Sequence, residues 1–217
     1  TGTFLSFIRT SQPKQWERFE KIYGADSERQ LIDRFCREVK LVGLLKVLRQ
    51  ASPTGASSSG PCSGSRRPLS TRPARPNMPP TILHCTRQLH YSLNSENSID
   101  IVLFLNGIPV VSMELKCQFT GQDTTNAIQQ YKFDRAGKDA IFEFKNRVLV
   151  HFAVDLTNVY MTTRLEGPKT YFLPFNQGSN GPGRDGGAGN PPSSDGDYVT
   201  SYLWKDVLQK DSLLDIL

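Results

Sequence analysis

The sequence predicts an α/β domain, and three observations on the order and spacing of its residues support this. Segments with helical periodicity alternate with short β-rich runs, a pattern typical of a sheet flanked by helices. Asn106–Gly107 separates two such runs and is a strong signal for a tight hairpin turn. The 217 residues, of which 37% are hydrophobic and 22% charged, suffice for one folded domain with appendages.

Residues 11–24 and 26–43 are expected to form two amphipathic helices near the start of the chain. Ser11 would be the N-cap of the first helix, because a serine there precedes a proline and then an apolar periodic run. The apolar face of this helix would carry Trp16, Phe19 and Ile22. A glycine is expected to end the second helix.

The elements after residue 80 follow from β-rich runs, turn residues and one further helical pattern. They are a strand over 86–93, the hairpin over 98–116, a helix over 124–135, strands over 147–155, 159–163 and 170–173, and a helix from about residue 200. His151 is expected to lie in the core of its strand rather than to act as a base. Residues 176–197 are rich in Gly, Pro, Ser and Asn and too long for a simple connection, so they predict a surface loop.

Residues 52–80 differ sharply in composition from the rest of the chain. They contain four arginines, no acidic residue and no aromatic residue, and they supply most of the formal net charge of +5. The basic balance therefore says little about the folded part. Such a segment buries too little apolar surface to offset its chain entropy, which predicts a disordered linker. An arginine-rich arm that contacts phosphates is the alternative.

Composition also bears on where the protein works. The longest apolar runs are far too short to span a bilayer, and the first residues do not have the pattern of a signal peptide. The four cysteines lack the spacing of a zinc site or a disulfide framework, which fits a reducing compartment. A cytoplasmic protein without a membrane partner is expected.

The hairpin over residues 98–116 is strongly apolar but has an aspartate near its start and a Glu-x-Lys sequence at its end. A two-residue loop at Asn106–Gly107 would put Asp100 and Glu114 on opposite faces. One further loop residue, or one β-bulge, would shift the pairing so that Asp100 opposes Glu114 and Lys116 follows on the same face. We favour the shifted register, because the other buries a lone carboxylate on each face.

A pair of opposed carboxylates has a definite chemical preference. Two such groups repel each other unless a cation lies between them. Mg²⁺ takes one or two carboxylates together with water and phosphate oxygens, so the pair predicts a magnesium site that acts on a phosphodiester. Lys116 would orient the attacking water or stabilise the developing negative charge. The alternative is that Glu114 and Lys116 are ordinary solvent-facing residues at a strand end.

Four blocks of sequence outside residues 52–80 stand out: SIDIVLFLNGIPVVSMELK, TGQDTTNAIQQYKFDR, LVHFAVDLTNVYMTTRLEG and TYFLPFNQG, with shorter blocks at 47–49 and 86–92. Together they resemble the nuclease region of the restriction (R) subunit of type I restriction–modification enzymes, which belongs to the PD-(D/E)xK superfamily. The resemblance implies a restriction-endonuclease-like α/β fold, a mixed sheet flanked by helices.

The same resemblance implies the site residues. Asp100 stands where the superfamily has its acid before the hairpin turn, and Glu114, Leu115 and Lys116 stand at its (D/E)xK sequence. Asp100, Glu114 and the main-chain carbonyl of Leu115 would be the metal ligands, with Lys116 as the catalytic lysine. Gln130 fits the glutamine of the family's QxxxY element and would support substrate, although an aspartate stands at the tyrosine position.

The implied activity is Mg²⁺-dependent hydrolysis of double-stranded DNA within a complex driven by ATP. ATP would bind a motor domain that is absent from this chain, because the glycine-rich stretch over 178–190 contains no GK[ST]. The implied partners are double-stranded DNA and the methyltransferase and specificity subunits of a type I complex. Two alternatives are a truncated, non-catalytic fragment that docks to DNA or to partner subunits, and a stand-alone nuclease of the same superfamily.

The expected organisation has five parts: an N-terminal helical part at 1–51, the Ser/Pro/Arg-rich segment at 52–80, the nuclease core at 81–175, the Gly/Pro-rich loop at 176–197, and a helix leading toward the absent motor at 198–217. The resemblance adds an interpretation of the second part. Family members have ordinary core-like sequence there, so a compensated pair of frameshifts in the gene would explain the abrupt change of composition.

Overall fold

The computed structural model describes residues 1–51, 81–92, 95–135, 139–193 and 196–217. The segment 52–80, predicted to be a linker or a frameshifted insert, lies outside the described residues.

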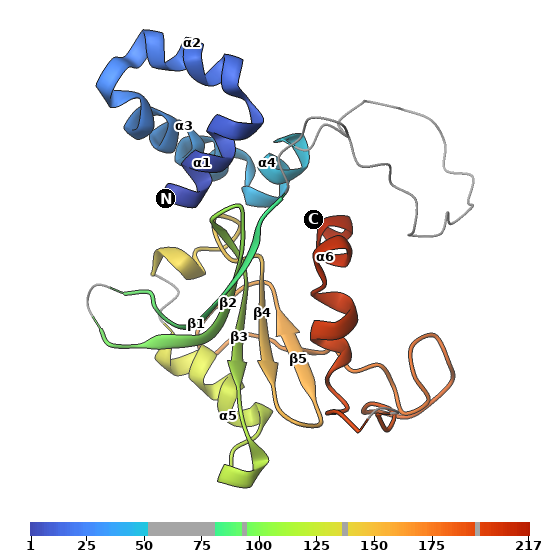
Figure 1. Cartoon of the computed structure of the whole chain (residues 1–217). Coiled ribbons are helices and arrows are strands. Elements are labelled where there is room, and N and C mark those ends of the chain that lie inside the picture. Colours follow the sequence, from blue (N-terminus) through green and yellow to red (C-terminus); the bar gives the residue numbers. More distant parts are fainter. Residues whose placement is uncertain (52–80, 93–94, 136–138, 194–195) are drawn as a thin grey trace.

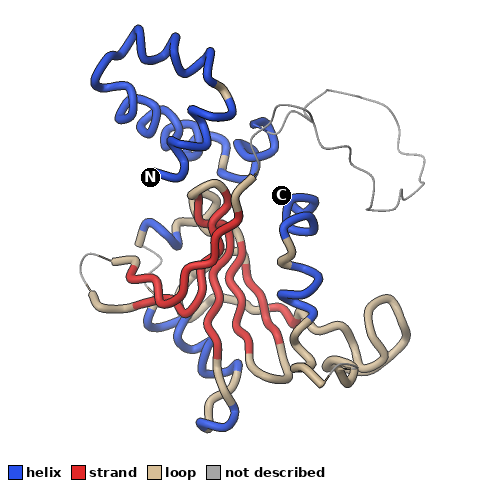
Figure 2. Tube along the Cα trace, viewed as in Figure 1, coloured by secondary structure: helices blue, strands red, loops and turns tan. Residues whose placement is uncertain are grey.

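A six-stranded sheet forms the centre of the fold (Figures 1 and 2). Its strands are β1 (Leu83–His90), β2 (Ser98–Leu105), β3 (Ile108–Leu115), β4 (Val150–Val154), β5 (Val159–Thr162) and β6 (Leu173–Pro174). They lie in sequence order across the sheet, and each pair of neighbours is antiparallel except β3 and β4, which are parallel. A parallel pair needs a crossover connection, which here contains α5. The predicted mixed sheet flanked by helices is confirmed.

The helices lie in three parts of the chain: before the sheet, in the crossover between β3 and β4, and after the sheet (Figure 1). They are α1 (Gly2–Ser11), α2 (Pro13–Tyr23), α3 (Ser27–Val42), α4 (Leu44–Ala51), α5 (Thr124–Gln129) and α6 (Lys210–Ile216). Short 3₁₀ turns lie at Gly24–Asp26, Gln118–Thr120 and Ala140–Phe142, and π-helical segments at Gln130–Asp134 and Leu203–Val207. The π-helical segment after α5 carries residues of the candidate site.

The start of the chain corrects one sequence expectation. Ser11 is the last residue of α1, and its hydroxyl donates to the carbonyl of Phe7 at 2.7 Å instead of capping the next helix. The break falls at Gln12 because the residue before a proline is disfavoured in the helical region, and Pro13 then starts α2. The apolar face of α2 is also narrower than expected: Trp16 is buried, whereas Ile22 is 72% exposed.

The end of the chain differs from expectation in the extent of two elements. Residues 166–170 form a turn, in which the Thr170 hydroxyl donates to the carbonyl of Gly167 at 2.7 Å and accepts from the amide of Glu166 at 2.8 Å. The last strand is therefore confined to β6. The helix expected from residue 200 consists of the segment Leu203–Val207 followed by α6. In residues 176–197 the described part forms turns without helix or strand, as predicted.

Two hydrophobic cores cover the two faces of the sheet. One lies between the sheet and the C-terminal helices and includes Val111, Met113, Phe152, Leu203 and Leu213. The other lies beneath α5 and the π-helical segment that follows and includes Ile99, Val102, Ala127, Tyr131 and Ala153. β3 contributes Val111 and Met113 to the first core, and the alternate residues Ser112 and Glu114 are also fully buried. A carboxylate at the end of such a strand is consequently held in a buried position.

The hairpin between β2 and β3 has the predicted shifted register. Asn106 and Gly107 form a two-residue turn with φ angles of 51° and 84°, and Leu105 pairs with Ile108. The pairing then shifts by one residue between Leu103 and Phe104, so that Ile101 faces Met113. A β-bulge, rather than a longer loop, thus places Asp100 opposite Glu114.

Replacing Gly107 by alanine is expected to lower the free energy of unfolding by about 2–3 kcal/mol. The residue has a φ of +84°, and a Cβ there would lie 2.9 Å from the amide nitrogen of Phe4 in α1. Gly121→Ala is the matched control, because Gly121 has a φ of +72° but nothing within 4 Å of its Cβ position. Chemical denaturation of both variants measures the difference. Equal losses would contradict a contribution from the contact with α1.

Candidate functional site

Two carboxylates meet where β2 begins and β3 ends. Asp100 is half-buried, and Glu114 has no exposed surface. The Leu115 amide donates to Asp100 Oδ2 at 2.8 Å, which fixes the aspartate against the strand that carries the glutamate. The amide of Lys116 donates to the carbonyl of Val154 at 2.8 Å and keeps the end of β3 attached to β4. The predicted meeting of Asp100 and Glu114 therefore has a rigid β-sheet base.

Arg135 binds Glu114 from the side of the π-helical segment. Its Nε and Nη2 donate to Glu114 Oε1 at 2.9 and 2.6 Å, and both side chains are almost fully buried. Nη2 also donates to the carbonyl of Ser98 at 2.8 Å. Both of these bonds to the glutamate reach Oε1, and Glu114 Oε2 is buried without a hydrogen-bond partner. The carboxylate is thus held through Oε1 alone, and its second oxygen is left unsatisfied.

Burial is the main influence on the Glu114 carboxyl group and raises its pKa from 4.5 to about 7. The Arg135 guanidinium acts in the opposite direction, and the nearby Asp100 carboxylate raises the pKa further. A cation between the two carboxylates would favour the charged form of both.

Lys116 and Gln130 line one pocket of about 400 Å³ beside the carboxylates. Its other lining residues are Gln122, Asn126, Gln129, Phe133 and Asp134. Amide groups therefore dominate its polar lining, and Gln130 Oε1 is buried without a hydrogen-bond partner. The two residues that the resemblance assigned to substrate and to catalysis therefore line one cavity, in which one amide oxygen has no hydrogen-bond partner.

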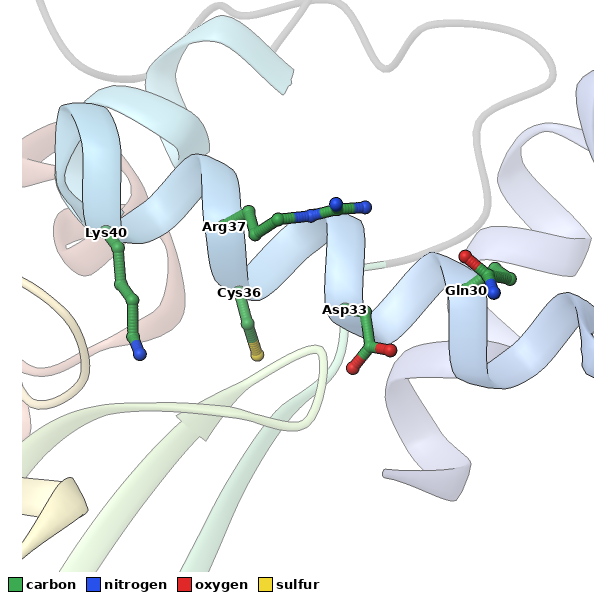
Figure 3. Close-up of a pocket in the computed structure, with 5 residues that line it drawn as sticks. All are labelled: Gln30, Asp33, Cys36, Arg37 and Lys40. Atoms are coloured by element: carbon green, nitrogen blue, oxygen red, sulfur yellow. The ribbon is translucent and has the colours of Figure 1, made fainter.

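A second pocket, of about 360 Å³, lies on α3 and is lined by Gln30, Asp33, Cys36, Arg37 and Lys40 (Figure 3). Figure 3 shows these side chains spread along one helix rather than directed at a common point. The sequence predicted no site there, and the arrangement resembles an ordinary charged helix surface.

The carboxylates of Asp100 and Glu114 and the carbonyl of Leu115 are oxygen ligands of the kind that Mg²⁺ accepts. The part of the chain that the structure describes contains no group of three or more His, Cys, Asp or Glu side chains that could hold a metal. Mg²⁺ does not need such a cage, because it commonly binds one or two carboxylates and keeps several waters. The orphaned Glu114 Oε2 is the observation that favours a cation, since a buried acceptor without a partner is costly.

A buried hydrogen-bonded group lies behind Glu114 on the same face of the sheet. Ser112 Oγ is 2.9 Å from the Tyr131 hydroxyl and 2.7 Å from Nδ1 of His151, its neighbour on β4. This group anchors the helix carrying Gln130 to the strand that carries Glu114. His151 is 1% exposed, and burial lowers its pKa from 6.5 to about 3. The prediction that His151 belongs to the core is confirmed.

We expect His151→Asn to reduce the dependence of the free energy of unfolding on pH at acid pH. Below pH 6.5 the unfolded chain binds a proton at His151 that the native protein does not, so stability falls with pH by up to about 1.4 kcal/mol per unit. The contribution is present above pH 6.5 and is lost as pH falls toward 3, the folded pKa. Denaturation curves between pH 4 and 7 measure it as the difference in slope between the two proteins. Parallel slopes would contradict a neutral buried histidine.

Sequence reasoning missed two residues that contact the carboxylates. Arg135 lies at the end of the predicted helix, four residues after Tyr131, and nothing in the sequence marked it as a buried residue. Gln88 donates from Nε2 to Asp100 Oδ1 at 2.9 Å. It stands directly across from the aspartate on the neighbouring strand, which became visible only with the β1–β2 register.

Comparison with known proteins is consistent with this geometry. Residues 77–170 match the family model of the type I restriction enzyme R protein N terminus. This segment is similar to the N-terminal region of type I restriction enzyme R proteins. The match spans somewhat less than half of the chain and contains both carboxylates, Lys116, Gln130 and Arg135. No curated protein and no solved structure matches the chain.

The matched segment includes the first three strands, α5 and the two strands that follow the crossover. The family belongs to restriction enzymes and so to nucleases. Across the described residues of the whole chain, no helix combines the length and apolar character needed to cross a membrane.

Proposed function

We propose that this R-protein region hydrolyses phosphodiester bonds of double-stranded DNA with the help of Mg²⁺. The observation that carries the proposal is the pair of opposed carboxylates, in which Arg135 binds only Oε1 of Glu114 and Oε2 is buried without a partner. An arginine ion pair alone would not need a second carboxylate beside it. The family match supports a nuclease, but it does not identify a metal ion or a substrate.

We assign the residues of the site to three roles: metal binding, catalysis and DNA binding. Asp100, Glu114 and the Leu115 carbonyl would hold the ion. When bound, Mg²⁺ lowers the pKa of a coordinated water and neutralises charge on the phosphodiester. Lys116, at the mouth of the pocket, donates hydrogen bonds to the attacking water or to a phosphate oxygen on which negative charge develops. Gln130 contributes an amide to the binding of the DNA backbone.

The reaction leaves a phosphate monoester and a free hydroxyl, because water attacks phosphorus and one P–O ester bond breaks. We place it within an ATP-driven type I complex, in which a separate specificity subunit selects the DNA sequence and a methyltransferase subunit assembles alongside. ATP would be used by a motor domain of that complex. These partners follow from the family to which the matched region belongs.

Calorimetry with Mg²⁺ and with Mn²⁺ tests the site. The unaltered chain should bind the ions, and Asp100→Asn and Glu114→Gln should each abolish binding, because each removes one charge while keeping side-chain volume. Asp33→Asn, on the surface of α3, is the matched control and should bind as the unaltered chain does. Equal binding by all four proteins would contradict the site and favour a fragment without catalytic function.

A further inference from the structure

We propose that Gln88 is a positioning residue that holds Asp100 for metal binding. This inference rests on the proposed function. Gln88 lies in β1, where Arg87 pairs with Ile101 and Leu89 with Ile99, so it stands directly across from Asp100. No sequence signal or family match assigned it a role.

The Gln88 amide has a fixed orientation because its two ends meet partners of opposite kinds. Nε2 donates to Asp100 Oδ1 at 2.9 Å, and Oε1 accepts from the Ser98 hydroxyl at 2.8 Å. An ionised carboxylate can only accept, so the amide nitrogen must face Asp100. The aspartate is thereby held by Gln88 at Oδ1 and by the Leu115 amide at Oδ2.

Gln88 also completes a chain of hydrogen bonds between the two carboxylates. From Asp100 it runs through the Gln88 amide to the Ser98 side chain, and from the Ser98 carbonyl through Arg135 to Glu114 Oε1. Each carboxylate therefore has one oxygen bound by a member of this chain of hydrogen bonds. Outer partners of this kind orient metal ligands and commonly change metal affinity by 10–100-fold when removed.

The backbone of Gln88 supports a functional rather than a merely structural role. Its φ is +49°, a left-handed conformation that is rare for a residue inside a strand and unfavourable for any side chain. Glycine adopts it without penalty. If Gln88 served only the stability of the sheet, replacing it by glycine would raise the free energy of unfolding. If Gln88 positions Asp100, its side-chain amide is needed and glycine cannot replace it.

The two roles predict opposite effects of a glycine on stability and on metal affinity, so variants of Gln88 can separate them. Gln88→Gly relieves the strained backbone and removes the amide, and Gln88→Met removes the amide while keeping side-chain length. Lys145→Gly is the matched control, because Lys145 also has a positive φ, of 67°, but lies beside α4, where its carbonyl accepts from the amide of Leu44. Mn²⁺ titration by electron paramagnetic resonance and the melting temperature are measured for each chain, with Asp100→Asn as the reference.

We expect both Gln88 variants to bind Mn²⁺ about tenfold more weakly, while Gln88→Gly melts at or above the temperature of the unaltered chain. Lys145→Gly should keep full affinity. If Asp100→Asn loses binding but both Gln88 variants stay within twofold of the unaltered chain, the positioning role is overturned and the metal site stands. A Gln88→Gly affinity loss accompanied by a matching fall in melting temperature also overturns it. Unchanged binding in Asp100→Asn overturns the metal site and the inference with it.

Discussion

Lys116→Met is expected to slow DNA cleavage by roughly 100- to 1,000-fold while leaving metal affinity and melting temperature unchanged. The loss is of the size seen when one donor to a developing negative charge is removed from a preorganised site. Metal binding should persist because the Lys116 ammonium is not a ligand and its main-chain bond to Val154 does not depend on the side chain. Relaxation of supercoiled plasmid with Mg²⁺ gives the rate, and calorimetry gives the affinity.

Lys40→Met supplies the control for this measurement. Lys40 lies exposed on α3, so its replacement changes the net charge by the same amount without touching the pocket at Lys116. Non-specific attraction to DNA should weaken equally in both variants. If Lys40→Met slows cleavage as strongly as Lys116→Met does, the lysine acts only through net charge, and its assigned role is wrong.

The register of the hairpin is the clearest case of what sequence and elementary energetics could predict. The twofold periodicity of strands allowed two arrangements of Asp100 and Glu114, and the cost of burying two separate carboxylates selected one of them. The structure has that arrangement through a bulge at Leu103 and Phe104. The adjacent turn and the helix between β3 and β4 were likewise predicted, because Asn-Gly and helical periodicity are strong local signals.

The residues that hold the site could not be predicted because their roles depend on contacts across the fold. Arg135 reaches Glu114 from the far end of a helix whose final turn is π-helical, and one extra residue in that turn changes where a side chain points. Gln88 acts through a strained backbone angle and a neighbouring strand. Tertiary contacts of this kind leave no periodicity, spacing or turn signal in the chain.

The N-terminal helices give a second case in which tertiary contacts could not be predicted from the sequence. Apolar periodicity predicted one face for α2, but Ile22 is 72% exposed because nothing in the described chain covers that end of the helix. Periodicity indicates which residues could share a face. It does not indicate how far the neighbouring elements extend over that face.

Arg135→Met should lower the free energy of unfolding by about 3–5 kcal/mol, the range found when one partner of a buried ion pair is removed. Glu114 and Arg135 have side-chain exposures of 0% and 2%, so the glutamate would keep a buried charge without its cation, or take up a proton. The second change Glu114→Gln should recover most of the loss, because a neutral amide leaves no buried charge behind.

The exposed pair Arg29–Asp33 on α3 gives the comparison, with side-chain exposures of 80% and 57%. Arg29→Met should change stability by no more than about 0.5 kcal/mol, because water screens such a pair. Urea denaturation of the four proteins at pH 8 measures all of these differences. If Arg135→Met costs no more than Arg29→Met, the guanidinium does not neutralise Glu114 in the folded state. The unsatisfied Oε2 would then reflect a carboxyl group that is already protonated, and a site of that kind could take a cation only by releasing a proton.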